Sequence, residues 1–160
     1  CYCELGDFQK GLVIFNEIAS QDNPKYAEDV VKAKENIKLY TNNRIAKLQG
    51  ENDFDGIIAV ADEMLAVNPQ DALAQKIRLQ ALFDKKDYAG VIASAEEAAA
   101  GQTDEEERSD VYFILGAAYN ARTMPQQAID ALSKVTAGAN VAAAQKTVAQ
   151  LKENAAKANS

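Results

Sequence analysis

The sequence predicts an all-α fold made of helices that pair into hairpins. Alanine, the strongest helix former, accounts for 30 of the 160 residues, whereas proline occurs 3 times and glycine 8 times. Valine and isoleucine are scattered along the chain and form no strand-like runs. A short pattern also recurs in which an acidic residue precedes an aromatic one, and apolar residues at helical spacing follow it each time. Together these observations indicate an all-helical repeat protein.

The recurring pattern divides the chain into repeats. Its copies are Gly6-Asp7-Phe8, Asn52-Asp53-Phe54, Lys86-Asp87-Tyr88 and, in degenerate form, Thr123-Met124-Pro125. They are separated by 46, 34 and 37 residues, which is the range of helix-hairpin repeats. A single hairpin cannot bury its own apolar face, so the repeats must stack. We predict one domain over residues 1–160, with a partial repeat 1–24, repeats 25–70, 71–103 and 104–139, and a capping helix 140–158.

Helix-start signals accompany the repeats. An aspartate stands where an N-cap acceptor is needed in three copies, at Asp7, Asp53 and Asp87. Two further helix starts resemble capping boxes, in which a threonine is followed three residues later by Glu or Gln. These pairs are Thr103 with Glu106 and Thr123 with Gln126.

The partner helix of each repeat precedes the recurring pattern. We expect these helices at residues 72–84 and 112–121, and over 26–49 either one long helix or two helices broken at Thr41-Asn42-Asn43. In the helix 112–121 the small Gly116 allows a neighbouring helix to approach closely.

Composition excludes several functions. The chain has no histidine, and its two cysteines, Cys1 and Cys3, cannot complete a disulfide framework or a four-ligand zinc site. No apolar run is long enough to span a bilayer. A net charge of −7 repels the phosphate backbone of nucleic acids. We therefore expect no metal, no cofactor, no nucleic acid and no transmembrane segment.

The charge is unevenly distributed. Residues 1–50 are neutral, residues 51–107 carry −10, and residues 108–160 carry +3. The acidic middle is either a solvated helical exterior or a surface that steers a basic partner, and the sequence leaves both interpretations open.

The segment 51–62 resembles an EF-hand calcium loop. Acids occupy loop positions 1, 3, 5 and 12, and a glycine occupies position 6. However, Glu51 stands where a short aspartate is normal, and Asp62 is too short for the usual bidentate grip. A repeat turn with an N-cap explains the same residues, because the third copy has the turn without these acids.

Other candidate chemical groups lack partners. The carboxylates of Glu96-Glu97 and of residues 104–107 have no nucleophile or glycine-rich loop nearby, and acids at a helix start are explained by the helix dipole. Cys1 and Cys3 are two residues apart and point to nearly opposite sides of a helix. A lipid-anchored Cys1 is the alternative to incidental thiols. We predict that the protein is not an enzyme.

The repeats resemble the tetratricopeptide repeat (TPR) family. That family's unit of about 34 residues has a large residue, Leu-Gly and Tyr in its first helix, and an aromatic residue, a small residue and a proline in its second. The fourth copy matches with Tyr112, Leu115, Gly116, Tyr119, Ala128 and Leu132. The second copy matches with Phe54, Ala61, Met64 and Pro69, and the third with Tyr88, Ala95 and Ala98. The resemblance covers roughly residues 1–140.

The resemblance implies a right-handed α-solenoid that binds a protein or peptide segment on the concave face lined by the first helices. Carried over to this sequence, the groove positions fall on Lys76, Gln80, Phe83, Asp110, Phe113, Ala117 and Asn120. Three polar side chains, Lys76, Gln80 and Asn120, would hydrogen-bond a ligand backbone. Phe83 and Phe113 would hold an apolar side chain and face outward, because Leu82 and Leu115 take the inward positions.

One specialisation of the family does not fit. TPR proteins that clamp a C-terminal carboxylate use several converging basic and asparagine residues, whereas Lys76 stands nearly alone here. Ile77 and Ile114 occupy positions where such a clamp needs polar groups. We therefore expect a peptide ligand to be recognised along its length.

A structural role is the rival hypothesis. If Cys1 falls inside the first helix of a repeat, the chain begins halfway through a unit, as a fragment of a longer polypeptide or a mature form cut at Cys1. The apolar edge at Leu5, Phe8 and Leu12 would then be covered by self-association or by another domain. The chain would be a spacer. We expect a soluble domain, as part of a longer or envelope-associated bacterial protein, and leave its compartment open.

Overall fold

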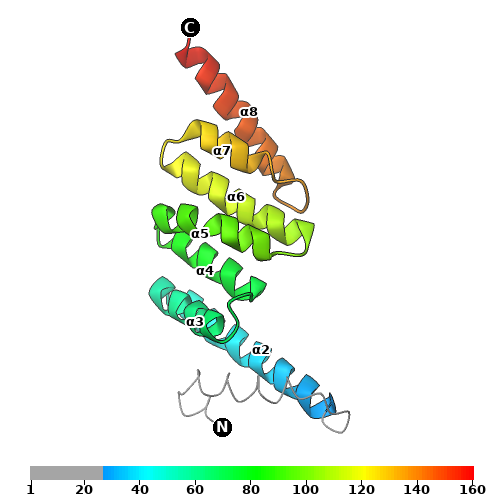
Figure 1. Cartoon of the computed structure of the whole chain (residues 1–160). Coiled ribbons are helices and arrows are strands. Elements are labelled where there is room, and N and C mark those ends of the chain that lie inside the picture. The colour runs from blue at the N-terminus through cyan, green and yellow to red at the C-terminus, as the bar shows by residue number, and fades with distance from the viewer. Residues whose placement is uncertain (1–26) are drawn as a thin grey trace. The chain divides into compact units, whose positions relative to one another are not determined.

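The described part of the chain is entirely helical. A computed structural model describes residues 27–160, which form seven helices and no strand (Figure 1). The helices are α2 (Ala27–Gly50), α3 (Phe54–Val67), α4 (Ala72–Asp84), α5 (Tyr88–Gly101), α6 (Glu105–Ala121), α7 (Pro125–Leu132) and α8 (Val141–Ala158). The all-α prediction is confirmed for these residues. None of these helices is long and apolar enough to cross a membrane.

The predictions for the N-terminal segment lie outside the described residues. These are the partial repeat 1–24, the cap at Asp7, the two cysteines and the apolar edge at Leu5, Phe8 and Leu12. They stay predictions.

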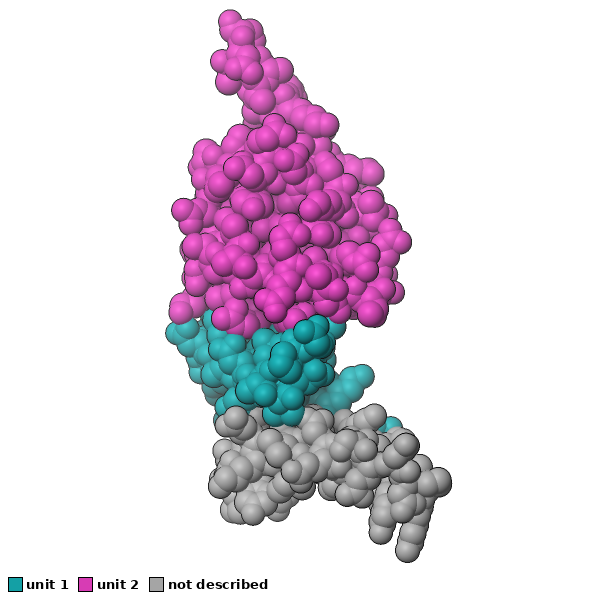
Figure 2. All heavy atoms as spheres, in the orientation of Figure 1, with its two compact units in different colours: residues 1–74 teal, residues 75–160 magenta. Residues whose placement is uncertain are grey.

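The chain divides into two compact units, residues 1–74 and residues 75–160, which Figure 2 shows in different colours. The boundary falls inside α4, after its first turn. Each unit is described by itself below, and the expected single domain over residues 1–160 stays a prediction.

In the first unit, α2 packs against α3. α2 runs without a break through Thr41-Asn42-Asn43, which answers the question that the sequence left open. Thr41 and Ile45 are buried one turn apart on α2, and on α3 the buried stripe is Ile57, Val60, Ala61 and Met64. Arg44, on the same part of α2, donates to the Glu63 carboxylate of α3 over 2.9 Å. Apolar packing and an ion pair at its margin thus fix this helix pair.

Within residues 27–160 the same turn occurs three times, at the three copies of the sequence pattern that fall in this range. Asn52, Lys86 and Thr123 each adopt a left-handed backbone, with φ of 53°, 67° and 61°. In each case the next residue donates its backbone N–H to the carbonyl five residues earlier. The bonds are Asp53 to Leu48 at 2.9 Å, Asp87 to Leu82 at 2.8 Å, and Met124 to Tyr119 at 3.0 Å. This is the Schellman helix ending, and its recurrence confirms that the marked positions are equivalent turns between helices.

The aspartate caps predicted at Asp53 and Asp87 are confirmed, whereas both capping boxes are wrong. Asp53 and Asp87 accept the backbone N–H of Gly56 and Gly90. α6, however, is capped by Asp104 and not by Thr103, since the Asp104 carboxylate accepts from the Glu107 N–H. The N-cap of α7 is Met124, with no side-chain bond, because Thr123 is used in the left-handed turn.

In the second unit, each helix from α4 to α7 buries small and branched apolar residues. The fully buried side chains include Leu79 on α4, Val91 and Ala95 on α5, and Val111 and Leu115 on α6. α5 presents Val91, Ala95, Ala98 and Ala99 on its buried face. Since alanine is short, α5 can lie close to its neighbours, which explains the alanine-rich apolar face of the third copy.

α8 covers the C-terminal end of this core, as a capping helix was expected to do. Its Ala144 joins Leu132 and Val135 in a buried cluster, against which Tyr112, Phe113, Val141, Val148 and Leu151 also pack. We call these eight residues the C-terminal cluster. From residue 152 onward every residue is exposed, so the last two turns of α8 make no buried contact.

Candidate functional site

Two of the predicted groove residues meet between α4 and α6. Lys76 Nζ lies 2.9 Å from Asp110 Oδ2 and also hydrogen-bonds the Glu107 carboxylate. Partial burial lowers the pKa of the Lys76 ammonium group, but the hydrogen bonds and negative charges of Glu107 and Asp110 outweigh this effect. The pKa is therefore raised above its ordinary value of 10.5. Lys76 holds two helices together, and its charge is already neutralised.

Asp110 extends this contact to the start of α8. The Nδ2 atom of Asn140, the residue before α8, donates to Asp110 Oδ1 over 2.9 Å. A single carboxylate on α6 therefore receives a hydrogen bond from α4 on one oxygen and from the N-terminus of α8 on the other. Lys76 and Asp110 are therefore in contact, and Asn140 joins them from the position just before α8.

The α4 residues Gln80 and Phe83 are engaged within the chain. Gln80 Nε2 donates to Asp84 Oδ1 one turn later, over 2.9 Å. The Phe83 ring packs edge-on against Tyr88, with ring centroids 5.5 Å apart. Gln80 is exposed and Phe83 is half-buried. Part of each side chain thus remains available on this face.

Phe113 contributes more to the fold than its predicted role would require. It is half-buried and belongs to the C-terminal cluster, in which it packs against the buried set of Leu132, Val135 and Ala144. The neighbouring Leu115 is buried, as predicted. Ala117, one turn beyond Phe113 on the same helix face, is also half-buried.

Asn120 lines a small polar pocket with residues of α8. The pocket has a volume of about 230 Å³, and its other lining residues are Thr147, Gln150, Leu151 and Asn154. Within residues 27–160, no hydrogen bond involves the carboxamides of Asn120, Gln150 and Asn154. Sequence reasoning missed the α8 residues, although their spacing (147, 150, 154) places them on one helix face.

The calcium-like segment has a structural role. Asp53, at the third loop position, caps α3 through the Gly56 N–H over 2.9 Å, and Glu51 and Asp55 are exposed. In the described range, no group of three or more His, Cys, Asp or Glu side chains is arranged to hold a metal ion.

Comparison of the chain with protein-family models, with curated proteins and with solved structures found no match. The TPR resemblance therefore stays a prediction that rests on the residues quoted for it. What the geometry adds is the contact of Lys76 on α4 with Asp110 on α6, the hydrogen bond from Asn140 to Asp110, and the pocket that Asn120 shares with α8.

Proposed function

We propose that the protein is a non-catalytic, TPR-like scaffold that binds an extended protein segment along the face of α4, α6 and α8. The observation that carries this proposal is the polar pocket between Asn120 on α6 and the carboxamides of Gln150 and Asn154 on α8. A carboxamide offers a donor and an acceptor side by side, which matches the N–H and C=O groups of a peptide backbone. Side chains of this kind, without protein partners, suit recognition of a ligand's main chain.

The charges around Lys76 restrict the kind of segment that can bind. Lys76 is paired with Glu107 and Asp110, so one positive charge meets two negative ones. A free C-terminal carboxylate or an acidic segment would be repelled here, in agreement with the argument against a carboxylate clamp. We infer a neutral or basic segment that is bound along its length.

Selection from a random-peptide display library, with the full chain as bait, tests the proposal. Peptides recovered in this way are then measured by fluorescence anisotropy against two matched variants, Gln150→Ala and Gln145→Ala. Both remove a glutamine from α8, but Gln150 lines the polar pocket, whereas Gln145 lies on another side of the helix. We expect binding to weaken about tenfold for Gln150→Ala and less than about twofold for Gln145→Ala. Equal effects of the two glutamine substitutions would contradict the proposal.

A further inference from the structure

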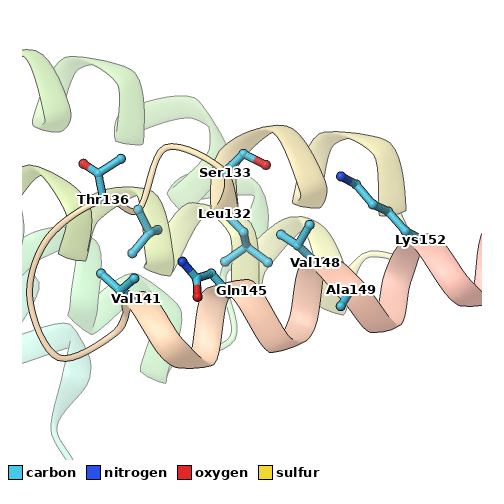
Figure 3. A pocket seen from close by; sticks show the side chains of 9 residues that line it. Leu132, Ser133, Thr136, Val141, Gln145, Val148, Ala149 and Lys152 are labelled. Carbon is cyan, nitrogen blue, oxygen red and sulfur yellow. The ribbon is translucent and has the colours of Figure 1, made fainter.

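A second surface lies on another side of α8, where it meets α7. A groove of about 550 Å³ runs between the end of α7 and the first three turns of α8 (Figure 3). Residues that line it include Leu132, Val135, Val141, Val148, Ala149 and Lys152. Figure 3 shows Leu132, Gln145 and Val148 in the middle of the groove, Val141 and Thr136 toward one end, and Lys152 toward the other.

The floor of this groove is the outer surface of the C-terminal cluster. Leu132 and Val135 are 3% and 5% exposed and form a fixed apolar floor, and the half-buried Val141 and Val148 contribute its apolar sides. Ala149 and Lys152 are exposed. An apolar floor with polar groups at the margin is the usual composition of a site that buries a partner's apolar side chains.

The charges around the groove are positive. Residues 125–158 contain only two acids, Asp130 and Glu153, against four lysines. Both acids are engaged, since Asp130 accepts from Gln126 and Glu153 pairs with Lys157. Of the other lysines, Lys134 pairs with Glu96 and lies over the Tyr112 ring. Lys146 and Lys152 have no ion pair with any described residue, and Lys152 is the one that lines the groove.

The shape of the groove favours a helix as its occupant. The α8 residues that line it, from Val141 to Lys152, repeat at intervals of three and four residues over about 16 Å, which is three helical turns. Two packed helices leave between them a furrow that accepts the side-chain ridge of a third helix. We propose that the groove of α7 and α8 binds an amphipathic helix of a partner protein, with apolar side chains on the Leu132–Val148 floor and a carboxylate at Lys152.

This site is distinct from the carboxamide pocket. At 100° per residue, Gln145, Ala149 and Lys152 lie on one side of α8, and Thr147, Gln150 and Asn154 lie on another. The two surfaces also differ in charge, because the face near Lys76 has an excess of acids. α8 thus presents two independent binding surfaces, and the failure of one proposal leaves the other intact.

The test uses a synthetic helical peptide and the full chain. The probe has leucines at positions i, i+3, i+4 and i+7 and glutamates on its remaining surface. One comparison peptide replaces the glutamates with lysines, and another replaces the leucines with serines. Binding is followed by fluorescence anisotropy. We expect the acidic leucine peptide to bind and neither comparison peptide to bind measurably, because apolar contact and charge are both required.

Two charge-matched variants of α8 locate the site. Lys152→Glu and Lys146→Glu change the net charge equally on the same helix, but Lys146 does not line the groove. We expect Lys152→Glu to weaken binding about tenfold or more and Lys146→Glu less than about threefold. Ala149→Trp, which fills the groove from an exposed position, should abolish binding without lowering the melting temperature.

Four results would overturn the proposal. Equal weakening by the two lysine variants, or binding of the serine peptide, would show non-specific charge attraction. Binding of the lysine peptide in place of the acidic one would show a partner of different chemistry. If sedimentation velocity shows a dimer that Ala149→Trp dissociates, the occupant is a second copy of this chain.

Discussion

Gly116 on α6 lies directly against Leu132 on α7. A Cβ atom built on Gly116 would come within 2.5 Å of Leu132 Cγ and 2.6 Å of Leu132 Cδ2, far inside the 3.5–4.0 Å of ordinary carbon contacts. Leu132 is 3% exposed and belongs to the C-terminal cluster, so it has little room to move. The absence of a side chain at Gly116 is therefore what allows these two helices to pack closely, as the sequence predicted.

Gly116→Ala should consequently destabilise the protein. Overpacking of a helix contact costs about 1–3 kcal/mol, and the gain in helix propensity of about 1 kcal/mol offsets only part of this. Gly50→Ala is the matched control, because a Cβ atom on Gly50 at the end of α2 meets nothing within 4 Å. Urea unfolding should show a lower free energy of unfolding for Gly116→Ala and no decrease for Gly50→Ala. An unchanged free energy of unfolding for Gly116→Ala would mean that the Leu132 side chain can move away from the added methyl group.

Local chemistry explains what the sequence predicted well. The helix 72–84 is found with the expected bounds, and Asp53 and Asp87 cap the helices that they precede. Each of these features depends on a few neighbouring residues, so a single sequence contains the signal. The capping box at Thr123 failed because the preceding helix needs a left-handed residue at that position. The one at Thr103 failed because the next residue, Asp104, caps α6.

The parts of the candidate site that were missed depend on register between helices. Lys76 and Asp110 were both predicted on one face, but their pairing, with Glu107 as a third member, is fixed by how α4 and α6 align. Asn140 reaches Asp110 because a loop of eight residues, 133–140, brings it back to α6. Spacing within one helix cannot show such contacts, since they depend on packing across some 30 residues of chain.

The Lys76 ion pairs should make stability fall at alkaline pH. Because the pKa of Lys76 is raised in the folded state above 10.5, its contribution is complete below pH 10.5 and is lost as the pH rises through the folded pKa. The difference in unfolding free energy between the native protein and Lys76→Met should therefore shrink above pH 10.5. Lys76→Arg, whose guanidinium group stays charged, should keep its advantage over Lys76→Met throughout. Parallel curves for all three proteins would contradict this account.

Phe113→Ala should destabilise the second unit by about 2–3 kcal/mol. Replacing a fully buried phenylalanine by alanine costs about 3–5 kcal/mol of stability. The expected loss is smaller here because Phe113, in the C-terminal cluster, is only half-buried. Phe83→Ala should cost less, because the loss of its edge-on contact with Tyr88 is worth about 0.5–1.5 kcal/mol. Thermal melting of both variants checks the order. If Phe113→Ala melts like the native protein, Phe113 is available as the ligand anchor that the TPR resemblance implies.

Two truncations should show which part of α8 stabilises the fold. Removing residues 153–160, which are exposed, should change the stability by about 0.5 kcal/mol or less. Removing residues 141–160 should expose Leu132 and Val135 and promote aggregation. The exposure of each of these side chains should lower the unfolding free energy by about 1.5–3 kcal/mol. Urea unfolding and light scattering check both results. Similar losses of unfolding free energy for the two truncations would show that the exposed end of α8 contributes to stability.

Ser109 controls the loop that leads into α8, and its substitution should affect both stability and binding. Its hydroxyl oxygen, on a residue that is 1% exposed, accepts the backbone N–H groups of Thr136 and Ala137 over 3.2 and 3.1 Å. Ser109→Ala leaves two donors without this acceptor, and we expect a loss of about 1–3 kcal/mol. Ser160→Ala is the control, since that exposed hydroxyl only donates to backbone carbonyls at the end of α8 and lines neither proposed binding surface.

Amide hydrogen exchange gives the decisive measurement for Ser109. In Ser109→Ala the Thr136 and Ala137 amides should exchange faster relative to those of α4 and α5, because the loop loses its attachment to α6. Since the same loop carries Asn140 and sets the position of α8, both proposed binding surfaces should weaken together. Unchanged exchange at these two amides would mean that the loop is held by the Thr136 hydroxyl, which bonds Glu105, and not by Ser109. In that case Thr136→Val, and not Ser109→Ala, would release α8.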